Sequence, residues 1–569
     1  MMIFRINRHS TSNVLLILFS ILMFPLYTAT AADNAKYSAI TPQEAISNQR
    51  QEFQKYEYQN REEKRLYTPG TQQPEHFDKD NHSNDYRCLA ASQIRIENSA
   101  FIPLPTQREW QKTIDGAECF SLAILRSILN EISSFYIREG MITSHALQPY
   151  QDKDGIIVIP VVEGKIDELI SDEQTSLMLP MVYPDAENRV FNMRDLEQAL
   201  DQINRLRTYD YTSYLKPGRA FGTSTIKFKP TDKHDDHHYF GGVGYSKYSR
   251  IGSFNVSLGY DNPFGIVDSL YLSLSREKPN QSQKSRSADL VYSVPYGYST
   301  FTLSQYISKS ESNILLGSGA TALYEFSSQR SSLDMSTLHY RDQTQTVSSS
   351  FALKYTDNRA EFGNQKLETS SERITYLDFG VDYVRRGSGH FFTSGFGVDM
   401  GLPDQFGTKE RSGNLPDATY KKVYFTTSYL TLLNIGLHFR SHFIGQYSED
   451  RLPGFKKVSI GGFYSVRGFK QYSYAGNTGG FIRNDLTKEL SLWFDDMQSN
   501  KLVFSVDAGM IISDDQGSKR TQLVGTNIGW RTSIYDVSAQ LDVGWSLYNN
   551  RADAPKDSPF IMGQVAYHF

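Results

Sequence analysis

One arginine of this 569-residue chain stands in a segment that is rich in glycine and aromatic residues. Arg467 lies within residues 461–469, which read GGFYSVRGF. A guanidinium group binds a carboxylate through two parallel hydrogen bonds, and a buried charge without a partner is costly. If this segment is buried, Arg467 needs a carboxylate. The chemistry it offers is then a charge-assisted contact between distant parts of the chain.

Candidate carboxylates follow in two segments with alternating apolar and polar residues. Asp507 lies on the polar face of residues 502–511. Asp485 and Glu489 share the polar face of residues 481–492. We predict that Arg467 pairs with Asp507, and we keep Asp485 and Glu489 as alternatives. An arginine solvated in a channel, with no fixed partner, is the other interpretation.

Two groups of histidines have residue types that metal sites and active sites use. Residues 234–238 read HDDHH, and His438, Arg440 and His442 fall on one face of a strand. A solvated linker and the polar wall of a channel explain these groups more simply than a metal site or a catalytic site does. We therefore expect no metal, no cofactor and no enzyme activity.

The chain contains two cysteines, Cys88 and Cys119. In an oxidising compartment, an isolated pair most simply forms one disulfide. A cross-link of this span contributes on the order of 3–4 kcal/mol in the chain-entropy model. Two free thiols or a metal site are the alternatives, but nothing nearby completes a set of ligands.

Residues 237–569 form a long series of stretches in which apolar and polar side chains alternate. In residues 537–547, for example, every second residue is apolar. A sheet can cross a membrane only as a closed barrel, because lipid offers no hydrogen bonds to a free edge. Bacterial single-chain barrels have an even number of strands. The alternating stretches number sixteen or seventeen, so we take sixteen and assign residues 320–326 to an extracellular excursion after the fifth strand. We take the terminal Phe569 as a barrel signal.

The order of these strands predicts on which side of the membrane each loop lies. Residues 261–265 and 295–297 form short turns, which are typical of the periplasmic side. Counting onward places residues 449–479, between the eleventh and twelfth strands, at the extracellular end. An external loop should be polar, but this one contains the aromatic run around Arg467. We predict that it folds back into the lumen, which sixteen strands leave wide enough for a channel.

The bulk composition is compatible with a barrel. The hydrophobic content is 39% and the mean hydropathy is −0.46. These values exclude a helical membrane protein, but they suit a barrel whose lumen is polar. The net charge of −4 gives no argument for a nucleic-acid partner. A large soluble β-sandwich or propeller is the alternative.

The amino-terminal residues indicate export. Residues 1–31 have the pattern of a signal peptide, with Arg5 and Arg8 before an apolar run and small residues at its end. An exported barrel belongs in a bacterial outer membrane. Residues 42–66 are dense in charged residues and predict a solvated helix, either on the surface or inside the barrel as a plug. Residues 67–85 have the composition of a linker.

Two small α/β units are predicted between the linker and the barrel. The first, residues 86–164, contains a helical stretch at 120–139 and a buried strand at 156–162. The second, residues 165–231, contains a helix that Asn192 caps. Such small sheets leave edges that can accept a strand from another chain.

Taken together, these motifs resemble those of the two-partner-secretion outer-membrane transporters, the TpsB or haemolysin secretion/activation family. Residues 465–469 (SVRGF) resemble the loop motif of the family, and residues 504–509 (FSVDAG) resemble its companion strand motif. Residues 136–140 (YIREG) and 161–164 (VVEG) resemble parts of its first POTRA domain, as does the cysteine pair. Residues 192–206 resemble its second POTRA domain. The likeness covers nearly the whole chain after the signal peptide.

The resemblance implies that Val466, Arg467, Gly468 and Phe469 form the loop motif and that Asp507 accepts the arginine. It also implies that the POTRA domains capture an unfolded exoprotein of the TpsA class in the periplasm. The barrel would conduct this exoprotein outward, and the amino-terminal helix would plug the pore at rest. Membrane lipid, the barrel-assembly machinery and periplasmic chaperones are further expected partners of a monomeric transporter.

A passive porin and a barrel-assembly factor are the rival functions. A porin does not need two periplasmic capture domains or an arginine loop folded into its lumen. An assembly factor of the same superfamily usually carries more POTRA units and lacks a plug helix. Secretion is therefore the predicted function.

Overall fold

Most of the chain forms one closed antiparallel barrel. The structure, a computed structural model, describes residues 88–569 except for 90–92, 116–119, 172–176, 233, 235–236, 249–250, 279–282, 316–319, 369, 409–417, 434–435, 471, 493–496, 514–518 and 552–556. The predicted signal peptide (1–31), plug helix (42–66) and linker (67–85) lie outside these residues. In the part that is described, no helix combines the length and the apolar character needed to cross a membrane.

The barrel has sixteen strands, the even number of the two that the alternation allowed, and the predicted mainly β fold class is confirmed. In order around the ring from the first to the last, the strands are β8 (Tyr239–Tyr248), β9 (Ile251–Asp261), β10 (Ser269–Lys278), β11 (Gln283–Tyr296), β12 (Ser299–Leu315), β13 (Thr321–Arg341), β14 (Gln345–Phe362), β16 (Glu372–Gly387), β17 (His390–Gly401), β18 (Lys421–Leu433), β19 (Leu437–Tyr447), β22 (Thr478–Glu489), β23 (Met497–Ser513), β24 (Lys519–Ile534), β25 (Val537–Asn549) and β26 (Phe560–His568). The two-residue strand β15 (Gln365–Lys366) pairs with the end of β14.

The last strand closes the ring on the first. β26 runs antiparallel to β8, with Met562 opposite Tyr248 and His568 opposite Gly242. Beyond that register, Gly241 N donates to the carbonyl oxygen of Phe569 at 2.7 Å, and Phe569 N donates to that of Gly241 at 3.0 Å. The carboxy-terminal aromatic residue is therefore part of the closure.

Side chains along the strands alternate between an outer apolar face and an inner polar face. On β23, Phe504 and Val506 are exposed to the outside, whereas Ser505 and Asp507 are fully buried. A strand with period-two alternation turns one face to lipid and the other to the lumen. The outward face of this strand is thus the lipid face, and Asp507 lies in the barrel interior.

The assignment of residues 320–326 to an excursion outside the strands is wrong. Residues 321–326 begin β13, a strand of 21 residues that pairs with both β12 and β14. Tyr324 and Phe326 are buried there in a cluster with Ala360. About ten residues suffice to cross a membrane as a tilted strand. The ladder of these long strands therefore continues beyond the membrane, and the side chains keep alternating there.

The first α/β unit packs two helices against a small sheet. The helices are α3 (Leu104–Asp115) and α4 (Leu122–Arg138), and the strands are β1 (Ile94–Glu97), β2 (His145–Ala146), β3 (Tyr150–Gln151) and β4 (Ile157–Val162). Ser121 caps α4 by accepting a hydrogen bond from Ile124 N, and Gly140 turns the chain after it with φ +83°. Helix α3 was not predicted from the sequence, and only its Trp110 and Ile114 are buried in the core.

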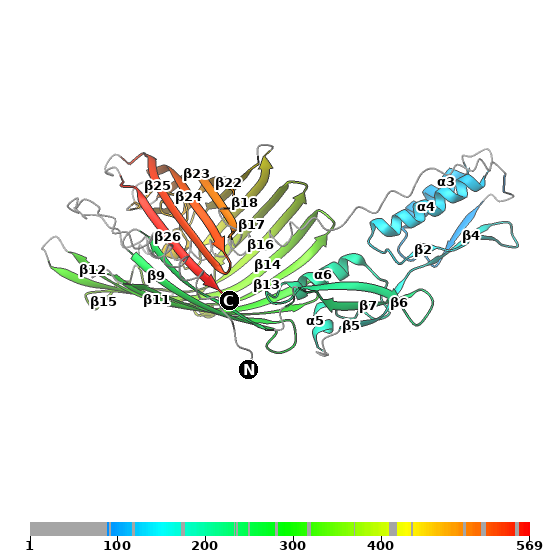
Figure 1. Cartoon of the computed structure of the whole chain (residues 1–569), viewed down its shortest axis with the longest axis horizontal. Coiled ribbons are helices and arrows are strands. Elements are labelled where there is room, and N and C mark those ends of the chain that lie inside the picture. The colour runs from blue at the N-terminus through cyan, green and yellow to red at the C-terminus, as the bar shows by residue number, and fades with distance from the viewer. Residues whose placement is uncertain are drawn as a thin grey trace.

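The second α/β unit lies between the first unit and the barrel (Figure 1). It contains α5 (Met178–Val182), α6 (Met193–Asn204), and the strands β5 (Lys165–Ser171), β6 (Tyr211–Pro217) and β7 (Thr223–Pro230). β7 is the central strand, parallel to β5 and antiparallel to β6. The side chain of Asn192 accepts a hydrogen bond from Arg194 N and so caps α6 as predicted.

Candidate functional site

The loop between β19 and β22 lies inside the barrel. It contains a short 3-10 turn, η2 (Gly454–Lys456), and a hairpin of β20 (Val458–Ile460) with β21 (Tyr474–Gly476). A β-carbon on Gly509, which is on the lumen face of β23, would stand 2.8 Å from side-chain atoms of both Ile460 and Val466. Val466 and Phe469 are buried in a cluster that also contains Phe481 and Ile511 from the wall. The loop therefore folds inward, and its apolar residues pack on the inner face of the barrel.

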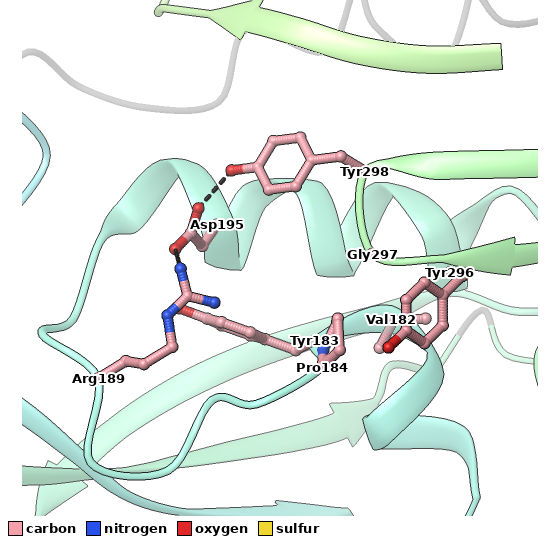
Figure 2. A pocket seen from close by; sticks show the side chains of 8 residues that line it. All are labelled: Val182, Tyr183, Pro184, Arg189, Asp195, Tyr296, Gly297 and Tyr298. Carbon is pink, nitrogen blue, oxygen red and sulfur yellow. Dashed lines mark hydrogen bonds and ion pairs between the residues drawn. The ribbon is translucent and has the colours of Figure 1, made fainter.

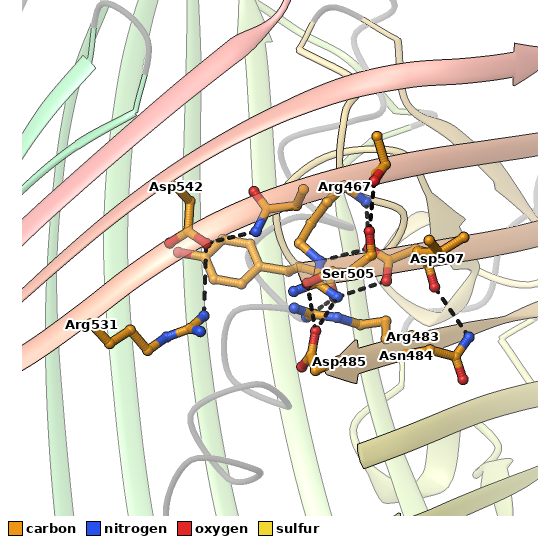
Figure 3. Close-up of polar contacts among 12 residues, drawn as sticks. Arg467, Arg483, Asn484, Asp485, Ser505, Asp507, Arg531 and Asp542 are labelled. Atoms are coloured by element: carbon orange, nitrogen blue, oxygen red, sulfur yellow. Dashed lines mark hydrogen bonds and ion pairs between the residues drawn. The ribbon is translucent and has the colours of Figure 1, made fainter. Parts of the chain in front are cut away.

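Arg467 is fully buried at the tip of this loop and contacts two carboxylates (Figure 3). Its Nε donates to Asp507 Oδ2 at 2.6 Å, and its Nη2 donates to Asp507 Oδ1 at 2.7 Å. Nη2 also donates to Asp485 Oδ1 at 2.7 Å. The backbone N–H of Arg467 adds a bond to Asp507 Oδ2 at 3.0 Å. The arginine thus joins its loop to two neighbouring strands, β22 and β23.

The two carboxylates are themselves held in place. Asp507 is fully buried, and Asp485 accepts a further hydrogen bond from Ser505 Oγ at 2.7 Å. A buried ion pair offsets the cost of its desolvation only when its remaining hydrogen-bonding positions are used. The bidentate contact and the backbone N–H meet that condition at Asp507. The pair therefore fixes the position of the loop tip rather than merely neutralising a charge.

Of the predicted alternatives, Asp485 contacts Arg467 together with Asp507, and Glu489 does not. Glu489 lies 3.1 Å from Lys501 and 3.9 Å from His438. It points to the same face as Asp485, but it stands four residues farther along the strand, a distance of roughly 13 Å. Glu489 as the partner of Arg467 is therefore wrong, because depth along the barrel separates two residues that share a face.

The glycine of the motif allows a close backbone contact. Gly468 has φ +103°, which disfavours other residues, and a β-carbon on it would overlap the carbonyl of Trp545 on β25. The β24–β25 register shifts beside this point, between Val524 and Gly525. A register shift of this kind bends the strands and re-aims their side chains. The loop tip is thus seated against an irregular part of the wall.

The loop tip also touches the strands that close the barrel. The Tyr248 hydroxyl on β8 donates to the carbonyl oxygen of Phe469 at 3.1 Å. Phe463 meets Phe560 of β26 edge-on, with ring centroids 6.0 Å apart. These contacts could not be predicted from the sequence, because no local pattern links residues more than ninety positions apart.

The remaining candidate residues take structural positions. His234 packs edge-on against Tyr209 and Tyr211 at 5.0 and 5.2 Å between ring centroids. Among the described residues, no group of three His, Cys, Asp or Glu side chains could hold a metal ion. Cys88 is disulfide-bonded, while its predicted partner, Cys119, lies outside the described residues.

The second α/β unit is bonded to the turns at one end of the barrel. Arg205 Nη2 donates to the carbonyl oxygen of Val267 at 2.8 Å, and its Nη1 bonds Ser293. Thr208 donates through both its backbone N–H and its hydroxyl to Asp261, at 2.9 and 3.0 Å. Because this unit contacts the turns predicted to be periplasmic, the loop carrying Arg467 enters from the opposite end.

A pocket of about 140 Å³ lies at this junction, and Figure 2 shows the side chains that line it. It lies between the start of α6 and the turn at residues 296–298, where the Tyr298 hydroxyl bonds Asp195. Gly297 N also donates to the carbonyl oxygen of Met181 at 2.7 Å. Burial, and then the nearby Asp195 carboxylate, raise the pKa of Tyr183 in this pocket, so its hydroxyl stays protonated at neutral pH. The junction is therefore built from several directional contacts.

Comparison with known protein families supports the function that this geometry suggests. The family of haemolysin secretion/activation proteins ShlB/FhaC/HecB matches residues 244–532, just over half of the chain. The chain belongs to this family. A POTRA domain matches residues 165–217, within the second unit. The protein is therefore a two-partner-secretion transporter of the bacterial outer membrane. Its POTRA region lies in the periplasm, and its partner is a secreted TpsA-type exoprotein.

Individual relatives extend the match beyond the barrel. The chain is 28% identical to the outer membrane transporter CdiB of Escherichia coli O6:K15:H31 over 447 residues, 76% of this chain and 74% of that one. It is 24% identical to the haemolysin transporter protein ShlB of Serratia marcescens, over 79% and 81% of the two chains. The solved structure of CdiB from Escherichia coli superposes with a TM-score of 0.84 at 25% identity, covering 94% of this chain and all of that one.

Proposed function

We propose that this transporter closes its channel with loop 449–479 and opens it by releasing the loop tip from Asp507 and Asp485. The observation that carries the proposal is the complete burial of Arg467 inside a lumen that must be clear for a polypeptide to pass. Charge-assisted hydrogen bonds are strong and directional. The hydrogen bonds of Arg467 hold the loop tip in one position at rest, and all of them break when the tip moves out of the lumen.

We propose that the POTRA domains receive the exoprotein in an unfolded state, through its amino-terminal secretion domain, before it reaches the barrel. Two observations on the second unit support this order of events. Its strand β6 lies at the edge of the sheet order β5-β7-β6, and Tyr214 and Leu215 are exposed on it. An edge strand with exposed apolar side chains can bind an extended segment by strand addition. The unit is also bonded directly to the barrel through Arg205 and Thr208.

The helix predicted at residues 42–66 would be the second obstruction in the resting channel. Its charged composition bars it from lipid but suits a water-filled lumen. The sequence contains no nucleotide-binding motif, so folding of the exported protein outside the cell would supply the driving force. Barrel-assembly machinery, periplasmic chaperones and membrane lipid would be the remaining partners of a monomeric transporter.

The test is export by an Arg467→Gln variant in cells that also produce the transporter's TpsA-type exoprotein. Glutamine keeps a polar side chain but leaves the fully buried Asp507 and the partly exposed Asp485 without the cation that contacts both. Breaking a buried pair in this way costs on the order of 3–5 kcal/mol. We expect the exoprotein in the medium to fall strongly while the barrel still migrates as a folded, heat-modifiable band. Export at the wild-type level by this variant would remove the proposed role of the loop.

The same variant distinguishes this function from a passive porin. A porin would pass small solutes in the wild-type state, and its conductance would not depend on Arg467. For a transporter closed by the loop, we expect low resting conductance in planar bilayers and higher conductance after Arg467→Gln.

A further inference from the structure

A second buried ion pair holds the same loop at its base. Lys456, the last residue of η2, lies with its Nζ 2.5 Å from Asp399 Oδ2 on β17. Both residues are almost fully buried, with 8% of Lys456 and 2% of Asp399 exposed. Neither residue stands in a sequence motif that predicted this contact. A buried lysine and aspartate at this distance form a contact whose loss leaves an uncompensated charge.

Aromatic rings complete the surroundings of this pair. The Lys456 ammonium lies 3.2 Å from the ring centroid of Tyr376 on β16, within the range of a cation–π contact. The hydroxyl of Tyr420 donates to Asp399 Oδ1 at 2.7 Å. Lys422 stands 3.9 Å from the same carboxylate. The lysine is thus held by a charge and a ring on the inner side of the wall.

The backbone around Lys456 is fixed as well. Gln446 Nε2 donates to the carbonyl oxygens of both Lys456 and Asn477, at 2.9 and 3.0 Å. One side chain therefore joins the two arms of the loop where they leave the barrel. Leu452 N adds a bond to Asn477 Oδ1 at 3.2 Å. These contacts define the loop base as a unit separate from the tip at Arg467.

The two ion pairs lie at different places on the wall. Asp399 precedes the last residue of β17, Gly401, by two positions and so lies near the outer end of the barrel. Asp485 and Asp507 lie away from the ends of β22 and β23, in the interior of both strands. The hairpin of β20 and β21 connects the two regions, and Gly461, Gly462 and Gly468, all with positive φ, lie between its two strands.

We propose that Lys456 and Asp399 are positioning residues for export. They hold the loop base as a fixed pivot while the tip, which carries Arg467, moves away from Asp485 and Asp507. This inference rests on the proposed gating role of the loop and adds which part of it moves. A loop held only at its tip would swing out as one body when the tip is released. A loop with a buried charge pair at its base keeps the base in place and moves only the hairpin.

The test uses two cysteine probes in the full-length transporter in cells. Leu452→Cys reports on the base and Val466→Cys on the tip, because both positions are fully buried at rest. A membrane-impermeant maleimide is added from outside. We expect Arg467→Gln to raise labelling on the order of tenfold at the tip probe and to leave the base probe protected. Equal exposure of both probes would overturn the pivot.

The second arm changes the base. Asp399→Asn leaves Lys456 and Lys422 close together without their carboxylate, so we expect labelling of the base probe to rise on the order of tenfold and export to fall. Lys456→Arg keeps the charge and the ring contact, so we expect protection and export near those of the unmodified chain. Asp404→Asn, an exposed carboxylate just after β17, is the matched control and should change neither readout.

Folding is controlled by a double variant. Asp399→Asn with Lys456→Met removes both charges, which avoids a lone buried ion if the single variant fails to insert. We expect this variant to give a folded, heat-modifiable barrel with an exposed base probe and reduced export. A folded double variant with a protected base and normal export would overturn the inference, and the Arg467 proposal would be unaffected.

Discussion

The carbonyl group of Arg467 rests directly on Gly525 of β24, and a β-carbon on that glycine would overlap the carbonyl oxygen. Gly525 is the cross-strand neighbour of Asp507, the residue that binds the guanidinium. The arginine is therefore held through its side chain by one strand and through its backbone by the next. On neighbouring strands, the wall therefore offers a carboxylate to the guanidinium group and a glycine without a side chain to the carbonyl group.

A side chain at position 525 should displace the loop without removing any charge. For Gly525→Ala we predict a folded barrel, raised channel conductance and reduced export, because the strand is paired on both sides and cannot retreat. Planar-bilayer recordings and secretion assays measure the two effects. Gly244→Ala on β8 is the control, since its nearest neighbour, Ala566 Cβ, would be at an ordinary 3.5 Å. Wild-type conductance in Gly525→Ala would show that the loop does not need the close contact between Arg467 and Gly525.

Two carboxylates on one face of β22 should differ in their effect. We predict that Asp485→Asn weakens export, because it removes one of the two carboxylates bonded to Arg467. Glu489→Gln should leave export unchanged, because Glu489 is exposed and contacts Lys501 instead. A secretion assay with both variants, at matched levels of folded barrel, measures the difference. Equal losses would indicate a general need for negative charge in the lumen.

Removal of residues 42–66 should open the channel further. If this helix obstructs the lumen at rest, its deletion raises single-channel conductance without destabilising the barrel, whose closure involves only β8 and β26. Combining the deletion with Arg467→Gln should raise conductance above either change alone, because the two obstructions are separate. Conductance equal to that of the intact chain would argue against a plug.

The junction between the second unit and the barrel should control how firmly the POTRA region is oriented. Arg205→Met removes the bonds to Val267 and Ser293 while keeping a side chain of similar length. We predict faster hydrogen exchange in the turns at residues 261–268 and 293–298, together with reduced export. Arg108→Met, at an exposed position of α3 in the first unit, serves as the control. Unchanged exchange in Arg205→Met would mean that Thr208 and Met181 suffice to hold the unit.

The sequence was most informative where structure repeats locally. Period-two alternation is a property of each strand by itself, so the lumen position of Asp507 follows from residue types. Alternation also limited the strand count to sixteen or seventeen, and the even number of strands in such barrels selected sixteen. The contact of Arg467 with Asp507 could be anticipated because a lone arginine in an apolar run needs a carboxylate. Glu489 could not be set apart from Asp485, because their depth in the barrel depends on the register between strands.

Other features depend on contacts that no local pattern records. Lys456 and Asp399 are 57 positions apart, and neither stands in an unusual segment. Glycine is needed at position 525 because the carbonyl group of Arg467 packs against it. The sequence of β24 alone does not show this contact. The helix α3 was missed for a different reason, since only one narrow stripe of it is apolar and buried.

The loop precedes in the chain the strands that receive it. Residues 449–479 come before β23, β24 and β25, and the ring itself closes only when Phe569 meets Gly241. The loop therefore depends on residues that lie outside it: Asp507 on β23 binds its arginine, and Gly525 on β24 makes room for its backbone. The loop is not a barrier by itself. A different barrel that received residues 449–479 would need an aspartate and a glycine at matching places on its own wall before the loop could close it.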